Sequence, residues 1–139
     1  MYGLKMKKEY LIEILYYGRM NDARTFDTAI RGRIGLIDAD TYELLGYANL
    51  VSTTQITYEG FINWHINEDF DKGKAAEYIN NLEFTKLQEK CYLYNFENIE
   101  EKEIPVIVNP LSEANIWVEF NEEDSTKGYK QVSLFDLDI

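Results

Sequence analysis

The sequence predicts an α+β fold, mainly an antiparallel β-sheet with one or two short helices packed on one face. Three observations support this class. About eight short segments have the β-branched and aromatic composition of strands, and one segment near the middle has apolar residues at helical spacing. The chain has 139 residues, of which 45% are hydrophobic, and this is enough to close one core but not two.

The first half of the chain contains three predicted strands. Residues 9–17 are rich in Tyr, Ile and Leu and predict a strand, which a polar loop over residues 18–22 follows. The next two predicted strands are residues 28–37 and 42–53. The four residues between them, 38–41, have the Asp-rich composition of a tight turn, because Asp side chains hydrogen-bond to nearby backbone N–H groups. These segments therefore predict a β-hairpin.

The middle of the chain predicts a strand and the main helix. Residues 55–67 alternate between apolar and polar side chains, which is typical of a half-buried strand. Residues 71–82 predict a helix, because their apolar residues recur at helical spacing and Asp71 suits the N-cap. Residues 84–96 predict a short helical turn followed by a strand.

The C-terminal part predicts short strands and an extended tail. Residues 100–103 predict a charged turn, and residues 104–108 and 115–120 predict the two strands that follow it. We therefore expect one acidic α+β domain over residues 1–128. Residues 129–139 follow it as a C-terminal extended segment.

The net charge of the chain indicates which class of partner it binds. Lys and Arg number 14 against 25 Asp and Glu, so the net charge is −11. Residues 1–34 carry seven basic and four acidic side chains, and the excess of acid lies in the remainder. A nucleic-acid backbone requires concentrated Lys and Arg. We therefore expect a protein partner with a basic or apolar groove, and no direct contact with nucleic acid.

Few residues in the sequence suit catalysis. His65 is the only histidine and Cys91 the only cysteine, which excludes a site with two histidines, a Cys/His zinc cage and an internal disulfide. Residues 67–73 have oxygen ligands at alternate positions, but Lys72 stands where a calcium loop needs glycine. We therefore predict a protein that is not an enzyme and has no cofactor.

The sequence also bears on location. No segment approaches the roughly 20 apolar residues that span a bilayer. Glu13 interrupts the N-terminal apolar run, and no small-residue cleavage site follows it. We expect a cytoplasmic protein that does not contact a membrane.

One short motif near the C-terminus points to a partner. Residues 131–135, Gln-Val-Ser-Leu-Phe, resemble the Gln-x-(Ser/Asp)-Leu-Phe peptide by which bacterial polymerases and repair proteins bind the replicative sliding clamp. The resemblance implies that Gln131 is a polar anchor, that Ser133 is the matching small residue, and that Leu134 and Phe135 fill an apolar cleft. The same segment alternates as a terminal edge strand does, so a packed strand is the alternative.

Three functions follow from these observations. The first is a non-enzymatic protein-binding module, encoded by a phage or mobile element, that inhibits or assists a bacterial nucleic-acid-handling protein such as the sliding clamp. The second is an immunity or anti-defence protein that binds a nuclease, toxin or defence enzyme through an acidic surface imitating nucleic acid, with Glu122, Glu123 and Asp124 in contact. The third is a small carboxylate-dependent enzyme that uses Asp69 and Asp71 with a divalent metal ion.

Overall fold

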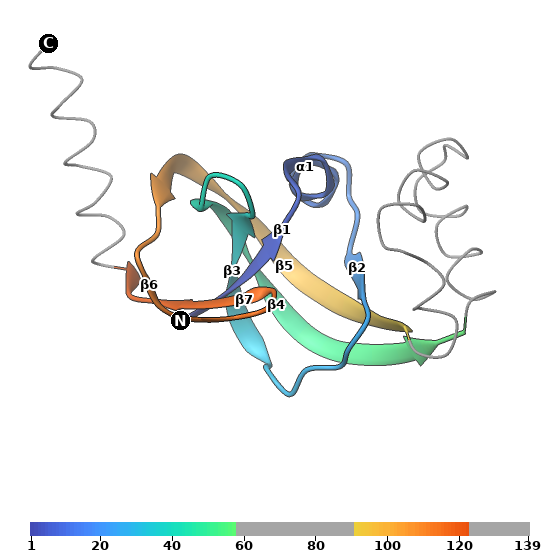
Figure 1. Cartoon of the computed structure of the whole chain (residues 1–139). Helices are drawn as coiled ribbons and strands as arrows, with labels where there is room; N and C mark the ends of the chain where they lie inside the picture. Colours follow the sequence, from blue (N-terminus) through green and yellow to red (C-terminus); the bar gives the residue numbers. More distant parts are fainter. Residues whose placement is uncertain (58–90, 123–139) are drawn as a thin grey trace, which may run out of the picture. The chain divides into compact units, whose positions relative to one another are not determined.

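The structure is a computed structural model, and it describes residues 1–57 and 91–122 of the chain (Figure 1). The elements in these residues are β1 (Tyr2–Met6), α1 (Lys8–Tyr16), β2 (Asn21–Arg24), β3 (Gly32–Asp38), β4 (Glu43–Ile56), β5 (Cys91–Ile107), β6 (Pro110–Ala114) and β7 (Trp117–Phe120). The strands pair in the order β2-β5-β4-β3-β1-β7-β6. The prediction of a sheet-dominated α+β fold with a short helix is confirmed for this part of the chain.

The sheet is mixed rather than purely antiparallel. β1 runs parallel to β3, whereas the pairs β1–β7, β2–β5 and β6–β7 are antiparallel. Parallel neighbours need a long crossover, and α1 and β2 supply one between β1 and β3. The parallel pair is therefore the departure from the predicted sheet.

The described residues divide into two compact units. The first unit contains residues 1–18, 32–49 and 97–122, and the second contains residues 19–31, 50–57 and 91–96. β2 lies in the second unit, and the long strands β4 and β5 contribute to both. The predicted boundary between residues 128 and 129 lies outside the described residues.

The core of the first unit is built around the ring of Phe120. Gly3 of β1 and Gly35 of β3 are partners in the parallel register. A Cβ at either position would lie within 3.1 Å of the Phe120 ring, and closer still to Ile37 at Gly3 and to Leu44 at Gly35, so these three side chains share the space beside the glycines. The other buried members of this cluster are Ile37, Leu44, Tyr47, Val106, Val108 and Val118.

Residues 9–17 form most of helix α1, and the predicted strand there is wrong. Tyr10, Leu11 and Ile14 are buried, and their spacing places them on one helical face. The helix ends where the Tyr17 N–H donates to the Glu13 carbonyl, and Gly18 follows with a left-handed φ of 75°. Tyr and Ile favour strands, but here the burial of apolar side chains at helical spacing stabilises a helix instead. Within residues 1–57 and 91–122, no helix is long and apolar enough to cross a bilayer.

The predicted hairpin is confirmed. β3 and β4 are neighbours in the sheet, and the turn between them is closed by the Tyr42 N–H, which donates to the Asp38 carbonyl at 2.9 Å. The Asp38 side chain accepts a hydrogen bond from the Asp40 N–H at 2.9 Å, as the Asp-rich composition predicted. Tyr42 leaves the turn with a φ of 63°, in a region that bulky side chains rarely adopt.

Several other segments differ from prediction. β2 begins inside the predicted polar loop, and β1 and β6 were not predicted. The predicted charged turn at residues 100–103 lies inside β5, because Glu and Lys lack the turn chemistry of Gly, Pro, Asn and Asp. The predicted helix at residues 71–82 and most of the strand at 55–67 lie outside the described residues.

Candidate functional site

Two of the buried charged side chains lie at β2 or just before it. The buried polar or charged side chains of the described residues are Glu13, Arg19, Asp22 and Asp38. Asp38 stabilises the β3–β4 turn, and Glu13 belongs to α1. Arg19 lies two residues before β2 and Asp22 lies within it, both in the second unit. Charged side chains are rarely buried without a partner or a function, so β2 is the candidate site.

An ion pair joins two charged residues of β2. Arg24 Nε lies 2.5 Å from Asp22 Oδ2, and the side chains are 15% and 1% exposed. Residues two apart on a strand point to the same face, so the pair lies along one side of β2. Removing both charges from water costs several kcal/mol, and such a pair is poor evidence of a stabilising role. We call Arg19, Asp22 and Arg24 the β2 charged site.

A buried tyrosine on β5 lies opposite this pair. Tyr94 is the register partner of Asp22, and its hydroxyl donates to the backbone carbonyl of Phe26 at 2.6 Å. Burial raises the pKa of Tyr94 to about 12, while the charges of Arg24 and Arg31 lower it and those of two aspartates raise it. The hydroxyl therefore stays protonated at neutral pH and serves as a fixed donor.

Hydrogen bonds fix the loop that follows β2. The Thr53 hydroxyl donates to Asp27 Oδ1 at 2.6 Å, and Arg31 Nη2 donates to the Thr53 hydroxyl at 3.2 Å. Arg31 Nη1 also donates to the carbonyls of Thr28 and Ile30, each at 2.8 Å. Hydrogen bonds from the Thr53 hydroxyl and the Thr28 N–H lower the pKa of Asp27. The exposed Arg31 is thus held in one place on the surface.

A ladder of hydrogen bonds between amide and hydroxyl side chains lies on the other face of β2 and holds this strand in place. Asn21, which alternates with Asp22, donates through Nδ2 to Asn95 Oδ1 at 2.5 Å. Asn95 Nδ2 donates in turn to the Ser52 and Thr54 hydroxyls, each at 3.0 Å. The Arg19 Nε donates to the Asn21 carbonyl at 3.0 Å, so the ladder and the charged site hold the same strand.

The two units differ in charge. The second unit, residues 19–31 and 50–96, carries seven basic and nine acidic side chains, a net charge of −2. In the first unit, residues 97–122 alone carry seven glutamates and one lysine. Most of the net negative charge of the chain therefore comes from the first unit, and β2 lies in the other.

The arrangement suits the binding of an anion. Arginine stays protonated at all accessible pH values, and its planar fork matches phosphate and carboxylate oxygens. Arg24 is partly exposed and Arg31 is exposed, and both lie near enough to Tyr94 for their charges to affect its pKa. In the part of the chain that the structure describes, no group of three His, Cys, Asp or Glu side chains could hold a metal ion, and we assign none.

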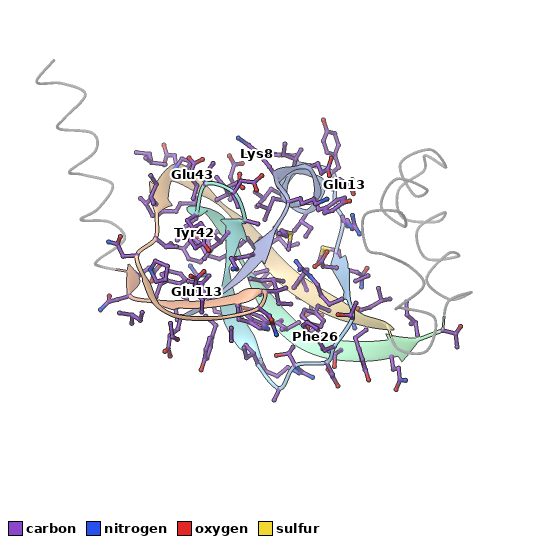
Figure 2. The ribbon with its side chains drawn as sticks, in the orientation of Figure 1. Lys8, Glu13, Phe26, Tyr42, Glu43 and Glu113 are labelled. Carbon is purple, nitrogen blue, oxygen red and sulfur yellow. The ribbon has the colours of Figure 1, made fainter. Side chains whose placement is uncertain are left out.

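A second polar cluster lies in the first unit, where Figure 2 labels two of its members. The Tyr42 hydroxyl donates to Glu113 Oε1 at 2.5 Å, and Lys5 Nζ lies 3.3 Å from the same oxygen (Figure 2). Lys5 also lies 5.5 Å from the centre of the Tyr42 ring, at cation–π distance. This cluster joins β1, the β3–β4 turn and β6.

The Glu113→Gln variant should show at which pH this cluster stabilises the protein. Hydrogen bonds from Tyr42 and then Lys5 lower the pKa of Glu113 below its ordinary value of 4.5. A carboxyl whose pKa is lowered in the folded state stabilises the protein at pH values above its unfolded-state pKa. This stabilisation is lost as the pH falls through the folded-state pKa. We expect the wild-type protein to melt above the variant at neutral pH, with the difference shrinking below pH 4.5. Melting temperatures between acid and neutral pH measure this.

The matched control is Glu103→Gln on β5. Its melting temperature should follow the wild-type curve across the same range. A Glu113→Gln difference that persists unchanged in acid would contradict the assignment.

One of the predicted partner-binding residues can be placed. The Tyr47 hydroxyl donates to Glu122, and burial, followed by this hydrogen bond, raises the pKa of Tyr47. The carboxylate of Glu122 is therefore engaged within the first unit. The remaining predicted residues lie outside the described residues and their roles stay predictions: Glu123, Asp124, Gln131, Ser133, Leu134 and Phe135. The same applies to His65, Asp69 and Asp71.

Sequence reasoning missed the β2 charged site. The polar composition of residues 18–22 predicts a loop. The available signal was the pattern of Arg19, Asp22 and Arg24 directly after an amphipathic segment. Its meaning depends on burial against β5, which lies some seventy residues further along the chain.

The fold is similar to that of the ASCH protein of Zymomonas mobilis. A serine-to-alanine variant of that protein matches with a TM-score of 0.62 over 96% of this chain and 94% of the other, at 15% identity. A tyrosine-to-phenylalanine variant matches with a TM-score of 0.62 over 96% of both chains, at 14% identity. The ASCH protein itself matches with a TM-score of 0.58 over 96% and 94%, at 14% identity. At this identity the likeness shows an ASCH-like fold.

The other comparisons give no match. No family model matches the chain, and no curated protein matches it.

The likeness to ASCH proteins corrects the predicted function. We predicted a phage or mobile-element protein that acts on the sliding clamp, with an acidic nucleic-acid mimic and a carboxylate enzyme as alternatives. The structural neighbours are ASCH proteins, which points away from such an inhibitor. The prediction failed because it rested on a motif of five residues and on the net charge of the chain, and neither defines a fold.

Proposed function

We propose that this chain binds RNA through the face of β2 that carries Arg24. The observation that carries the proposal is the Asp22–Arg24 pair on β2, with Arg31 held against Thr53 in the same unit. The likeness to ASCH proteins supports it, because these neighbours suggest an interaction with nucleic acid. The proposal replaces the expectation that the chain does not contact nucleic acid.

Each residue of the site has a distinct role. Arg24 and Arg31 contact backbone phosphates, as guanidinium groups do in most nucleic-acid complexes. Asp22 positions Arg24 through the 2.5 Å ion pair. Arg19, which is buried, fixes the start of β2 through the Asn21 carbonyl.

The proposed activity is binding without turnover. The arginines stay protonated, and the raised pKa of Tyr94 keeps its hydroxyl protonated at neutral pH. These groups donate hydrogen bonds and are poor general bases. We expect labelled RNA to stay intact after prolonged incubation with the protein, and appearance of fragments would contradict this part of the proposal.

The test of the proposal is a salt titration of RNA binding. Fluorescence anisotropy with a labelled RNA strand should give an affinity that falls between about 50 and 200 mM salt. Two phosphate contacts to a single strand predict a slope of about −1.4 in log K against log salt. Absence of binding at low salt, or an affinity that salt does not change, would overturn the proposal.

A further inference from the structure

We propose that one edge of the Arg31 guanidinium binds a phosphate of the ligand, and that Thr53 and Asp27 are positioning residues for this edge. The inference rests on the proposed function and adds to it the atoms that contact the phosphate and the residues that hold them. Two observations carry it. Arg31 makes three hydrogen bonds within the protein, and the hydroxyl that accepts one of them is itself oriented by a carboxylate.

The hydrogen bonds of Arg31 leave one edge of its guanidinium for a ligand. Arginine has five N–H groups, one on Nε and two each on Nη1 and Nη2. Nη1 donates to the carbonyls of Thr28 and Ile30, each at 2.8 Å, and Nη2 donates to the Thr53 hydroxyl at 3.2 Å. Within residues 1–57 and 91–122, these are the hydrogen bonds of this exposed side chain. The remaining N–H groups are therefore on Nε and Nη2, which share one edge of the guanidinium.

A carboxylate sets the direction of the Thr53 hydroxyl. This hydroxyl donates to Asp27 Oδ1 at 2.6 Å, so its oxygen is left to accept from Arg31. The same oxygen of Asp27 accepts from the Thr28 N–H at 2.7 Å, which holds the carboxylate in place. Thr53 lies on β4, so these hydrogen bonds tie the loop after β2, with its arginine, to a strand of the sheet.

The edge of Arg31 that carries Nε and Nη2 suits a phosphate. Two N–H groups on adjacent nitrogens match two oxygens of one phosphate, whereas a lysine ammonium is a point charge without this geometry. Because Arg31 is already held in the free protein, its side chain loses less freedom when a ligand binds. The negative charge of Asp27 opposes the binding of an anion. Its place beside Thr53 is therefore explained by the position it imposes and not by its charge.

The experiment compares variants of the full chain by fluorescence anisotropy with one labelled RNA strand. Arg31→Ala removes the guanidinium, and Arg31→Lys keeps the charge but not the paired N–H groups. Thr53→Val removes the hydroxyl at equal charge and nearly equal shape, and Thr53→Ser keeps the hydroxyl. Asp27→Asn keeps an acceptor oxygen and removes the charge. Thermal melting checks that each variant is folded.

We expect the loss of affinity to follow the geometry of Arg31 and not its charge. Arg31→Ala should weaken binding by about tenfold, and Arg31→Lys and Thr53→Val by about threefold each. The salt slope should fall to about −0.7 in Arg31→Ala, because one phosphate contact of two is lost, and should stay near the wild-type slope in Arg31→Lys. Thr53→Ser and Asp27→Asn should bind at least as tightly as the wild type.

A double-variant cycle separates positioning from a general structural role. If Thr53 acts through Arg31, Thr53→Val should have no further effect on affinity in the Arg31→Ala background. An equal loss in both backgrounds would show that the hydroxyl serves the fold and does not position the arginine.

The outcomes distinguish this inference from the function on which it rests. If the wild type binds RNA, and Arg31→Lys or Thr53→Val binds as tightly as it does, the positioned edge is rejected and the proposed function stands. If the wild type fails to bind the strand at low salt, the proposed function and the inference are rejected together.

Discussion

The Arg24→Ala variant should lose about 3–5 kcal/mol of unfolding free energy, and it should no longer bind RNA at moderate salt. The substitution removes the Nε partner at 2.5 Å from Asp22, whose side chain is only 1% exposed. Breaking a buried ion pair from one side leaves a desolvated charge, which is more damaging than losing both charges. Urea unfolding measures the loss of stability as a lower midpoint.

The first unit offers a matched control in Arg33→Ala. Arg33 lies 3.0 Å from Glu100, but these side chains are 47% and 59% exposed. Even with the contact of Arg33 to the Tyr47 ring at 4.0 Å, we expect a loss of about 1 kcal/mol and unchanged RNA affinity. Equal losses from Arg24→Ala and Arg33→Ala would refute a special role for the β2 pair.

A double variant separates folding from binding. Replacing both partners, as Asp22→Leu with Arg24→Met, removes the charges and keeps most of the volume. Such replacements of buried pairs are often neutral for stability. The double variant should therefore fold, and it should still fail to bind RNA because Arg24 is absent. RNA affinity equal to that of the wild type in this variant would show that the pair is structural.

Local chemistry explains which parts of the fold could be predicted. The β3–β4 hairpin depends on Asp38, whose side chain bonds to the N–H two residues on, and that information lies within the turn itself. Residues 9–17 have strand composition but fold as α1, because burial of Tyr10, Leu11 and Ile14 on one face decides the outcome. Burial depends on the rest of the fold, so composition alone could not settle it.

The candidate site could not be predicted from the local sequence for a similar reason. β2 has four residues and a polar composition, and nothing within it indicates that Asp22 is buried. Its pairing with Tyr94 on β5 creates the low-dielectric setting of the Asp22–Arg24 pair. The net charge of −11 did not indicate the site either, because a total over the chain does not show which charged side chains are buried.

The Phe120→Ala variant should lose about 3–5 kcal/mol of unfolding free energy. The ring is 1% exposed, and it packs over Gly3 and Gly35 in the core of the first unit. The glycines have no side chains that could fill the cavity, so its size depends on how far Ile37 and Leu44, which lie beside them, move into it. Phe120→Leu, which keeps more of the volume, should lose clearly less, and urea midpoints report both.

A second substitution tests whether the ring and the glycines are matched. A Cβ at Gly35 would lie 3.1 Å from Phe120 Cζ and 2.8 Å from Leu44 Cδ1, so Gly35→Ala alone should be destabilising by about 1–3 kcal/mol. In the Phe120→Ala background the clash with the ring is gone, and the added methyl group fills part of the cavity. The double variant should therefore be more stable than the sum of the two losses predicts, by about 0.5–3 kcal/mol. Strict additivity would mean that Phe120 does not pack on Gly35, and the account of this core would fail.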